Sequence, residues 1–172
     1  MGYSRNFGMR SFENIVRDGR FRTAAGSAHV IGAPVVLDSN TPGFLEAAGA
    51  GAAPGPAAGV VVYEHLLPTE IKQTSSDLNT VPGGVYAQIV HGPGAKVWFK
   101  NTASKTMYDG DVHAAAGLLA SSVVVANLKP GDALTPDGSG KFKVANGTTD
   151  GEWFVVEQAN SSTGVVEARF TF

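Results

Sequence analysis

Glycine and proline punctuate the whole chain and leave little room for long helices. Together they account for 31 of the 172 residues, as 22 Gly and 9 Pro. Both residue types disfavour helix interiors and favour turns between short strands. Residues 47–59 consist of nothing but Ala, Gly and Pro, so this segment has no side chains with which to build a core. We predict a flexible loop or an extended strap there, within a β-rich protein.

Short runs of β-branched and aromatic residues lie between these turns and are typical of strands. The predicted strands cover residues 33–37, 59–63, 85–90, 96–99 and 123–125. A hairpin with a Gly-rich turn joins residues 133–134 to 142–144. Residues 114–120 fit either a strand or a short helix.

The end of the chain carries the clearest strand pattern. Residues 153–156 are predicted to pair with residues 165–172 through a loop at 160–164. In the closing segment Val166, Ala168, Phe170 and Phe172 fall on one face, whereas polar residues fall on the other. This alternation is typical of a half-buried antiparallel strand. We predict one all-β domain over residues 28–172, a small β-barrel or β-sandwich, preceded by an N-terminal arm of residues 1–27.

Arginine is concentrated in that arm. Five of the six arginines lie in residues 1–22, where they face only Glu13 and Asp18, for a net charge of +3. The other 150 residues carry eight basic and thirteen acidic groups, for a net charge of −5. Arginine and aromatic side chains are enriched where proteins make strong contacts with partners. The predicted contact residues are Tyr3, Arg5, Phe7, Arg10, Phe12, Arg17, Arg20, Phe21 and Arg22.

A short helix is predicted within this otherwise extended arm, over residues 11–19. Ser11 is a suitable N-cap and Gly19 a suitable stop, while Phe12, Ile15 and Val16 share one face. Two helical turns are marginal in isolation, so this helix needs a surface on which to dock.

Catalytic and metal-binding patterns are sparse. The chain has no cysteine, which excludes disulfides and thiolate metal sites. Asp109, Asp111 and His113 would share one side of a strand and offer ligands to a divalent metal, but a solvated turn is the alternative we favour. The other acidic and imidazole pair is Glu64-His65. Ser139 lies in a Gly-Ser-Gly sequence with the features of a hairpin, not of a nucleophile elbow. We predict neither an enzyme nor a cofactor.

Charge and hydropathy constrain the partners. The pI near 6 and the acidic body disfavour nucleic acid as the partner of the arm, which leaves a protein surface as the favoured partner. No run approaches about 18 consecutive apolar residues, and the N-terminus lacks the apolar region of a secretory signal. We therefore expect no membrane partner and a product made in the cytoplasm.

The last third of the chain resembles the head decoration, or capsid cement, proteins of tailed bacteriophages. The resemblance lies in a Gly-Asp-x-Leu-Thr turn, a Gly-Lys hairpin and a final pair of strands around a Ser/Thr/Gly loop. The segments that carry it are residues 128–141, 144–147, 156–159 and 164–169, and the strands at 33–37 and 59–63 with the Ala/Gly segment between them also fit.

The resemblance implies a small β-rich virion protein, often trimeric, on the outer surface of the capsid. Such a protein stabilises the lattice by bridging major capsid subunits. The Arg-rich arm departs from the short, small-residue start that is usual in the family. Two alternatives remain: a tail-tube or head–tail connector protein, and a carbohydrate-binding β-sandwich on the virion that would need exposed Trp98 and Trp153.

Overall fold

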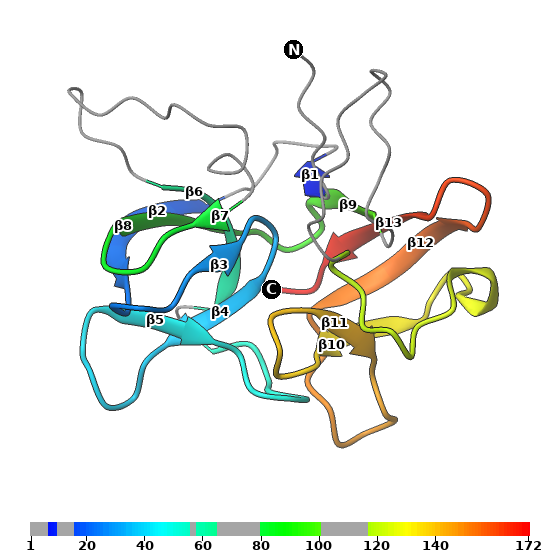
Figure 1. Cartoon of the computed structure of the whole chain (residues 1–172). Helices are drawn as coiled ribbons and strands as arrows, with labels where there is room; N and C mark the ends of the chain where they lie inside the picture. The colour runs from blue at the N-terminus through cyan, green and yellow to red at the C-terminus, as the bar shows by residue number, and fades with distance from the viewer. Residues whose placement is uncertain (1–6, 10–15, 56–57, 65–79, 101–116) are drawn as a thin grey trace, which may run out of the picture.

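A closed barrel and a six-stranded sheet make up the protein (Figure 1). The computed structural model describes residues 7–9, 16–55, 58–64, 80–100 and 117–172. Almost all regular structure in these ranges is β, so the predicted all-β class is confirmed. The described part of the chain contains no helix long and apolar enough to cross a membrane.

The barrel contains five strands in the order β2-β5-β4-β6-β8. These strands are Val16–Thr23, Phe44–Ala47, Pro34–Leu37, Gly59–Glu64 and Tyr86–His91. The β2–β5 pair is parallel and the other four pairs are antiparallel. A separate two-stranded sheet joins β3, His29–Val30, to β7, Thr80–Val81.

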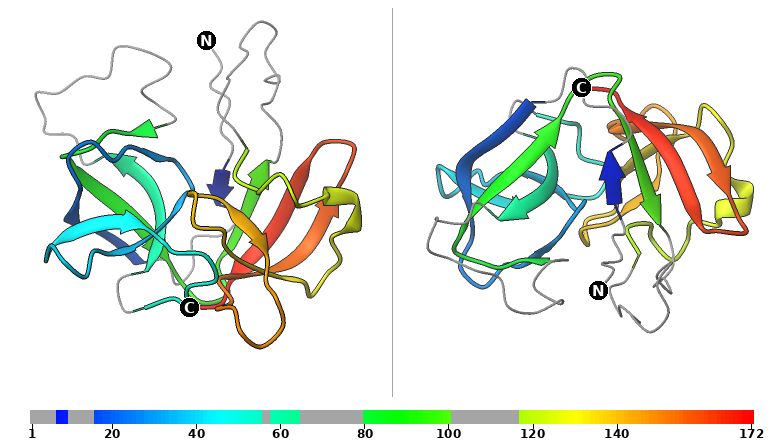
Figure 2. Two further views of the ribbon diagram at one scale, coloured as in Figure 1. Left: turned by 60° about the horizontal axis from the view of Figure 1, so that its bottom comes forward. Right: turned by 90° about the horizontal axis from the view of Figure 1, so that it is seen from above.

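The sheet has the strand order β1-β9-β13-β12-β10-β11, and its described pairs are all antiparallel. Its strands are Phe7–Met9, Lys96–Lys100, Val165–Phe170, Phe154–Asn160, Ala133–Pro136 and Phe142–Val144. A single turn of 3₁₀-helix, η2, covers Val125–Asn127. The views in Figure 2 show the barrel and the sheet side by side.

Strands β6 and β8 form a wall that the barrel and the sheet share. Val61 and Ile89 are register partners within the barrel core. Their neighbours Val60 and Val90 are also partners, but they belong to the core that includes the sheet. Because successive side chains of a strand point to opposite faces, both faces of the wall are buried at these four positions. This explains why the apolar residues Val60 and Val61 follow one another without alternation.

Five aromatic rings form the centre of the sheet core. Phe154 contacts Phe99 edge to face at 4.9 Å, and Phe142 in the same manner at 5.1 Å. Phe170 lies 4.4 Å from the Phe154 ring, and Trp153 packs against Phe142. Edge-to-face pairs contribute about 0.5–1.5 kcal/mol beyond the burial of their area. The core is therefore held by ring geometry as well as by apolar burial.

The C-terminal end of the chain lies where the barrel joins the sheet. The Gly92 amide, in the turn from β8 to β9, donates to the Phe172 carbonyl at 3.0 Å. The Gly94 amide donates to the Phe170 carbonyl at 2.9 Å. The Phe172 ring stacks on His91 and meets Trp153 edge to face at 5.2 Å. The last residues thus fasten the two halves of the molecule together.

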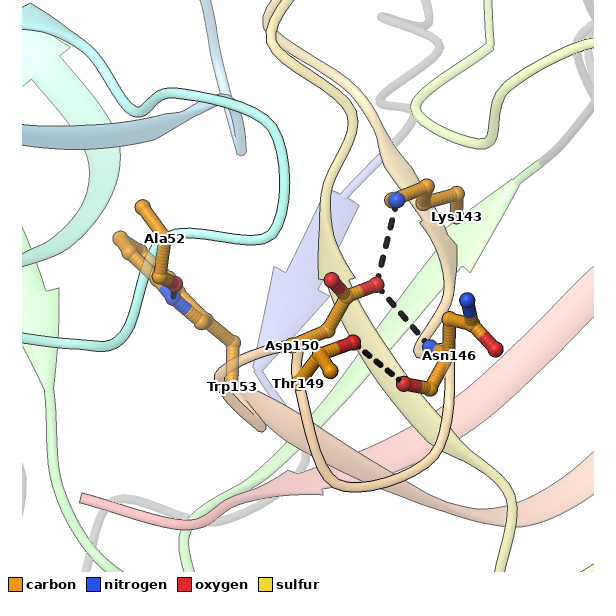
Figure 3. A network of polar contacts seen from close by, with 6 residues as sticks. All are labelled: Ala52, Lys143, Asn146, Thr149, Asp150 and Trp153. Carbon is orange, nitrogen blue, oxygen red and sulfur yellow. Dashed lines mark hydrogen bonds and ion pairs between the residues drawn. The ribbon is translucent and has the colours of Figure 1, made fainter.

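The Ala/Gly/Pro segment is an ordered strap over its described residues 48–55, which we call the strap. The Gly51 amide donates to the Pro136 carbonyl of β10, and the Gly151 amide donates to the Gly51 carbonyl, each at 2.9 Å. Trp153 donates its indole Nε1–H to the Ala52 carbonyl at 2.8 Å (Figure 3). The small side chains allow this close approach, so the strap binds the barrel to the sheet through its backbone.

Most predicted strands are confirmed. Residues 33–37, 59–63, 85–90 and 96–99 correspond to β4, β6, β8 and β9, and both C-terminal hairpins form as predicted. In β13 the alternate residues Val166, Ala168 and Phe170 are buried, whereas Arg169 is exposed. The short strands β3, β5 and β7 were not predicted.

Two predictions of local structure are wrong. Residues 16–19 belong to β2 and not to a helix, because they pair with β8. Residues 11–15 lie outside the described residues. The strand predicted at 123–125 is instead a pair of turns, in which the Val123 amide donates to Ala120 and the Asn127 amide donates to Val124. Val123 and Val125 are buried while Val124 is 54% exposed, so the apolar pattern reflects packing without a partner strand.

Candidate functional site

The predicted contact residues divide into three groups in the structure. Tyr3, Arg5, Arg10 and Phe12 lie outside the described residues. Phe7 lies in β1, and Arg17 and Arg20 lie in β2, where the backbone alone is described. The side chains of Phe21 and Arg22 are described. Residues 16–23 of the predicted arm are thus a strand of the barrel itself.

Phe21 packs partly against the barrel core. It is half-buried, is the register partner of the buried Ala87, and packs against the barrel core. Adjacent side chains of a strand alternate between faces, so this placement turns Arg22 to the outer face of the barrel. The partner contact at Phe21 stays a prediction, because the part of its side chain that is not buried is still open to solvent.

Arg22 is exposed and is held in place by two contacts. Its guanidinium donates to the Gly84 carbonyl at 2.9 Å, and its Cζ lies 5.2 Å from the centre of the Tyr86 ring. Tyr86 is the register partner of Arg22 on β8 and is itself 47% exposed. A guanidinium above an exposed ring gains about 0.5–1 kcal/mol from the cation–π contact. Arg22 is therefore oriented before any partner arrives.

A buried threonine fixes the turn on which Arg22 rests. Thr23 is fully buried, and its hydroxyl donates to the Pro82 carbonyl at 2.7 Å. Its backbone amide donates to Val85 at 2.9 Å, and its carbonyl accepts from Gly84 at 3.0 Å. A Cβ on Gly83 would come within 2.8 Å of three backbone atoms of residues 24–27. The turn is thus closely packed, and it places the Gly84 carbonyl rigidly under the guanidinium.

A third residue extends this surface on the other side of Arg22. Phe44, the first residue of β5, is half-buried and is the register partner of Arg22 in the parallel β2–β5 pair. Its neighbour Leu45 points into the barrel core, so Phe44 lies on the outer face. Tyr86, Arg22 and Phe44 therefore form a row across three adjacent strands, which we call the Arg22 row.

Tyr86 and Phe44 were not among the predicted contact residues. Tyr86 lies inside a predicted strand, but nothing in the local sequence indicates which strand lies beside it. Phe44 lies in an unpredicted strand. Only the strand order β8-β2-β5 brings the two aromatic rings to either side of the arginine.

The side chains of the candidate metal ligands are not among those that the structure describes. Asp109, Asp111 and His113 lie outside the described residues, as does His65, and Glu64 ends β6 without a described side chain. The described residues contain no group of three or more His, Cys, Asp or Glu residues that could hold a metal ion.

Ser139 is part of the β10–β11 turn, in agreement with the hairpin interpretation. Its hydroxyl and its backbone amide both donate to the Asp137 carboxylate at 2.7 Å. The Lys141 amide donates to the same carboxylate at 3.0 Å. Burial alone would raise the pKa of Asp137, but these hydrogen bonds outweigh it and lower the pKa below its usual value. Asp137 therefore remains ionised and fixes the turn.

The tryptophans do not offer the exposed pair that a carbohydrate site would need. Trp153 is fully buried beneath the strap, and Trp98 is half-buried in β9. Figure 3 shows Trp153 reaching Ala52 beside a polar turn at residues 146–150. In that turn Asp150 accepts from the Asn146 amide at 2.9 Å and pairs with Lys143 at 3.1 Å. The Asn146 amide and then Lys143 hold the pKa of Asp150 below its usual value.

A scan against protein-family models found no match to this sequence, and a comparison with curated proteins found none either.

Proposed function

We propose that this protein is a virion structural protein that binds the outer surface of an assembled phage capsid. It stabilises the lattice by bridging major capsid subunits. The observation that carries the proposal is the Arg22 row, a preoriented cation over the exposed Tyr86 ring with Phe44 as its register partner on the next strand. Such residues dominate binding energy at protein interfaces. The segments that resemble capsid decoration proteins lie largely on β10–β13, which form two paired hairpins, and this supports the same proposal.

The mechanism is thermodynamic. A protein that binds the assembled lattice, and not its free subunits, stabilises the lattice by mass action. Each copy that contacts more than one capsid subunit adds multivalent reinforcement, and assembly of this chain as a homotrimer would multiply those contacts. The larger core cluster, which contains Val60 and Val90 of the barrel, and the strap join the barrel to the sheet.

Co-sedimentation tests this proposal. Purified protein is mixed with capsids assembled from the major capsid protein of the same genome, and separately with unassembled subunits. The proposal predicts saturable binding to capsids alone, with a fixed copy number per capsid subunit. If the wild-type protein remains in the supernatant with expanded capsids, the proposed function is wrong.

Substitutions in the Arg22 row locate the contact. We expect Arg22→Glu and Tyr86→Ala each to weaken capsid binding roughly tenfold or more, as hot-spot residues do. Lys129→Glu, at an exposed lysine of the sheet half, makes the same change of charge and should bind as the wild type does. Deletion of residues 1–22 is not a clean test, because it removes seven of the eight residues of β2. If both variants bind capsids with wild-type affinity, the Arg22 row is not the contact surface.

A further inference from the structure

A cavity of about 350 Å³ lies at the seam between the barrel and the β10–β11 turn. The barrel half contributes His29, Val30 and Glu46 to its wall. The sheet half contributes Leu118, Ser139 and Lys141. This volume lies within the range of small-molecule sites, and a mixed apolar and polar wall is typical of them. The sequence gives no sign of the cavity, because its walls come from residues 26–47 and 117–141, which are far apart in the chain.

Two opposite charges border the cavity from opposite halves of the molecule. Glu46 lies on the outer face of β5, since it is the register partner of Val36, which packs toward the sheet core. Lys141 opens the segment that leads into β11. Both residues are half-buried, and no ion pair joins them to each other or to another described residue. The Asp137 carboxylate also attracts Lys141 electrostatically, but it already accepts hydrogen bonds from the Ser139 and Lys141 amides of the turn.

The wall also contains a polar group without a partner. His29 is 6% exposed, and its Nε2 has no hydrogen-bond partner among the residues that the structure describes. Burial lowers the pKa of His29, so the imidazole is neutral near pH 7. An unpaired buried polar atom is costly to the fold. Because the Nε2 atom itself is inaccessible, it is not counted among the groups that contact a ligand in the cavity.

We propose that this seam cavity binds a small zwitterion of the α-amino-acid class. The carboxylate of the ligand pairs with Lys141, its ammonium pairs with Glu46, and its aliphatic part lies against Val30 and Leu118. Glu46 would repel a ligand that carries only a negative charge, and Lys141 would repel one that carries only a positive charge. An uncharged polyol would leave both charges unpaired in a partly dry site. Such a ligand would also link the two halves of the molecule, independently of any capsid.

Calorimetric titration of the full-length protein with L-alanine, L-valine and L-leucine, one at a time, tests the proposal. Sodium acetate, methylamine and methyl glucoside serve as comparators that carry one charge or none. We expect at least one amino acid to bind saturably, with a dissociation constant of about 1 mM or below. We expect the comparators to bind at least tenfold more weakly.

Variants and spectra place the ligand in the cavity. Lys141→Met and Glu46→Gln should each weaken amino-acid binding at least tenfold, whereas Lys129→Met, at an exposed lysine outside the cavity, should not. Amide resonances of residues 26–30, 46 and 139–141 of the wild-type protein should shift on titration, a readout that does not depend on how any variant folds. Three results would each overturn the proposal: no saturable binding of any amino acid, equal binding of a comparator, or shifts confined to other residues.

Discussion

Gly151→Ala tests how closely the strap is packed against the sheet. A Cβ built on Gly151 lies 2.6 Å from the Ala53 nitrogen and 2.7 Å from the Ala52 oxygen. Ordinary van der Waals contact begins near 3.4 Å, and all of the opposing atoms belong to the backbone. No side-chain rotation can relieve this clash, so the backbone of the strap must move away from residue 151.

The loss of stability has two sources, the overpacked contact and the hydrogen bonds that the displaced strap weakens. Overpacking of a well-packed contact costs about 1–3 kcal/mol. Moving the strap also weakens the bonds from Gly151 to Gly51 and from Trp153 to Ala52, which adds roughly 1 kcal/mol. We therefore expect a loss of about 2–4 kcal/mol in the free energy of unfolding, and a fall in Tm of roughly 5–15 °C for a chain of this size. Urea denaturation and calorimetry measure the two quantities.

Gly49→Ala is the matched control. Gly49 lies in the same strap, but a Cβ there meets no atom within 4 Å. Its backbone is not in the left-handed region, so alanine should stabilise the protein by about 0.4–1 kcal/mol through the unfolded chain. The close-packing argument is refuted if Gly151→Ala unfolds at the same urea concentration as the wild type, or as Gly49→Ala.

Three further outcomes follow from single contacts. Trp153→Phe leaves the Ala52 carbonyl without its donor and should cost about 2 kcal/mol in urea denaturation; an unchanged midpoint would contradict the bond's role. Asp137→Ala removes the acceptor of three hydrogen bonds in the β10–β11 turn and should cost about 1–2 kcal/mol, also measured in urea. Burial lowers the pKa of His29 in the folded protein below the value of 6.5 in the unfolded chain. The contribution of His29 to stability is therefore fully present above pH 6.5, and it is lost below that pH because the unfolded chain binds a proton that the folded protein does not. Tm measured between about pH 7.5 and pH 5 should therefore fall more steeply in the wild type than in His29→Gln, and equal slopes would exclude His29 as the cause.

The predictions at the N-terminal segment show where local sequence patterns mislead. The local sequence predicts Gly19 as a helix stop, but Gly19 lies in a bulge of β2, where the register with β8 shifts between Asp18 and Phe21. Glycine suits both situations, because a bulge also needs backbone freedom. Two turns of helix have little stability of their own, whereas β2 gains ladders with both β8 and β5. Tertiary pairing therefore overrode the local signal.

The candidate site was predicted only in part. Arg22 was selected for its residue type and for its place in a cationic segment, and the structure does place it on an exposed face. Phe21, selected on the same grounds, packs on the barrel core because it is one position away along a strand. Without knowledge that residues 16–23 form a strand, the two side chains could not be assigned to opposite faces.

The sequence by itself determined the β class, the turns and the closing hairpin. These depend on neighbouring residues: Gly and Pro between β-branched runs, and the alternation of Val166, Ala168 and Phe170. Only the tertiary structure decided that Val60, Val61, Ile89 and Val90 of β6 and β8 would be buried on both faces, and that a segment of small residues would be a strap. It also decided that Arg22 would lie between Tyr86 and Phe44. The physical reason is that strand order and register arise from side-chain packing between segments far apart in the chain, which no local pattern records.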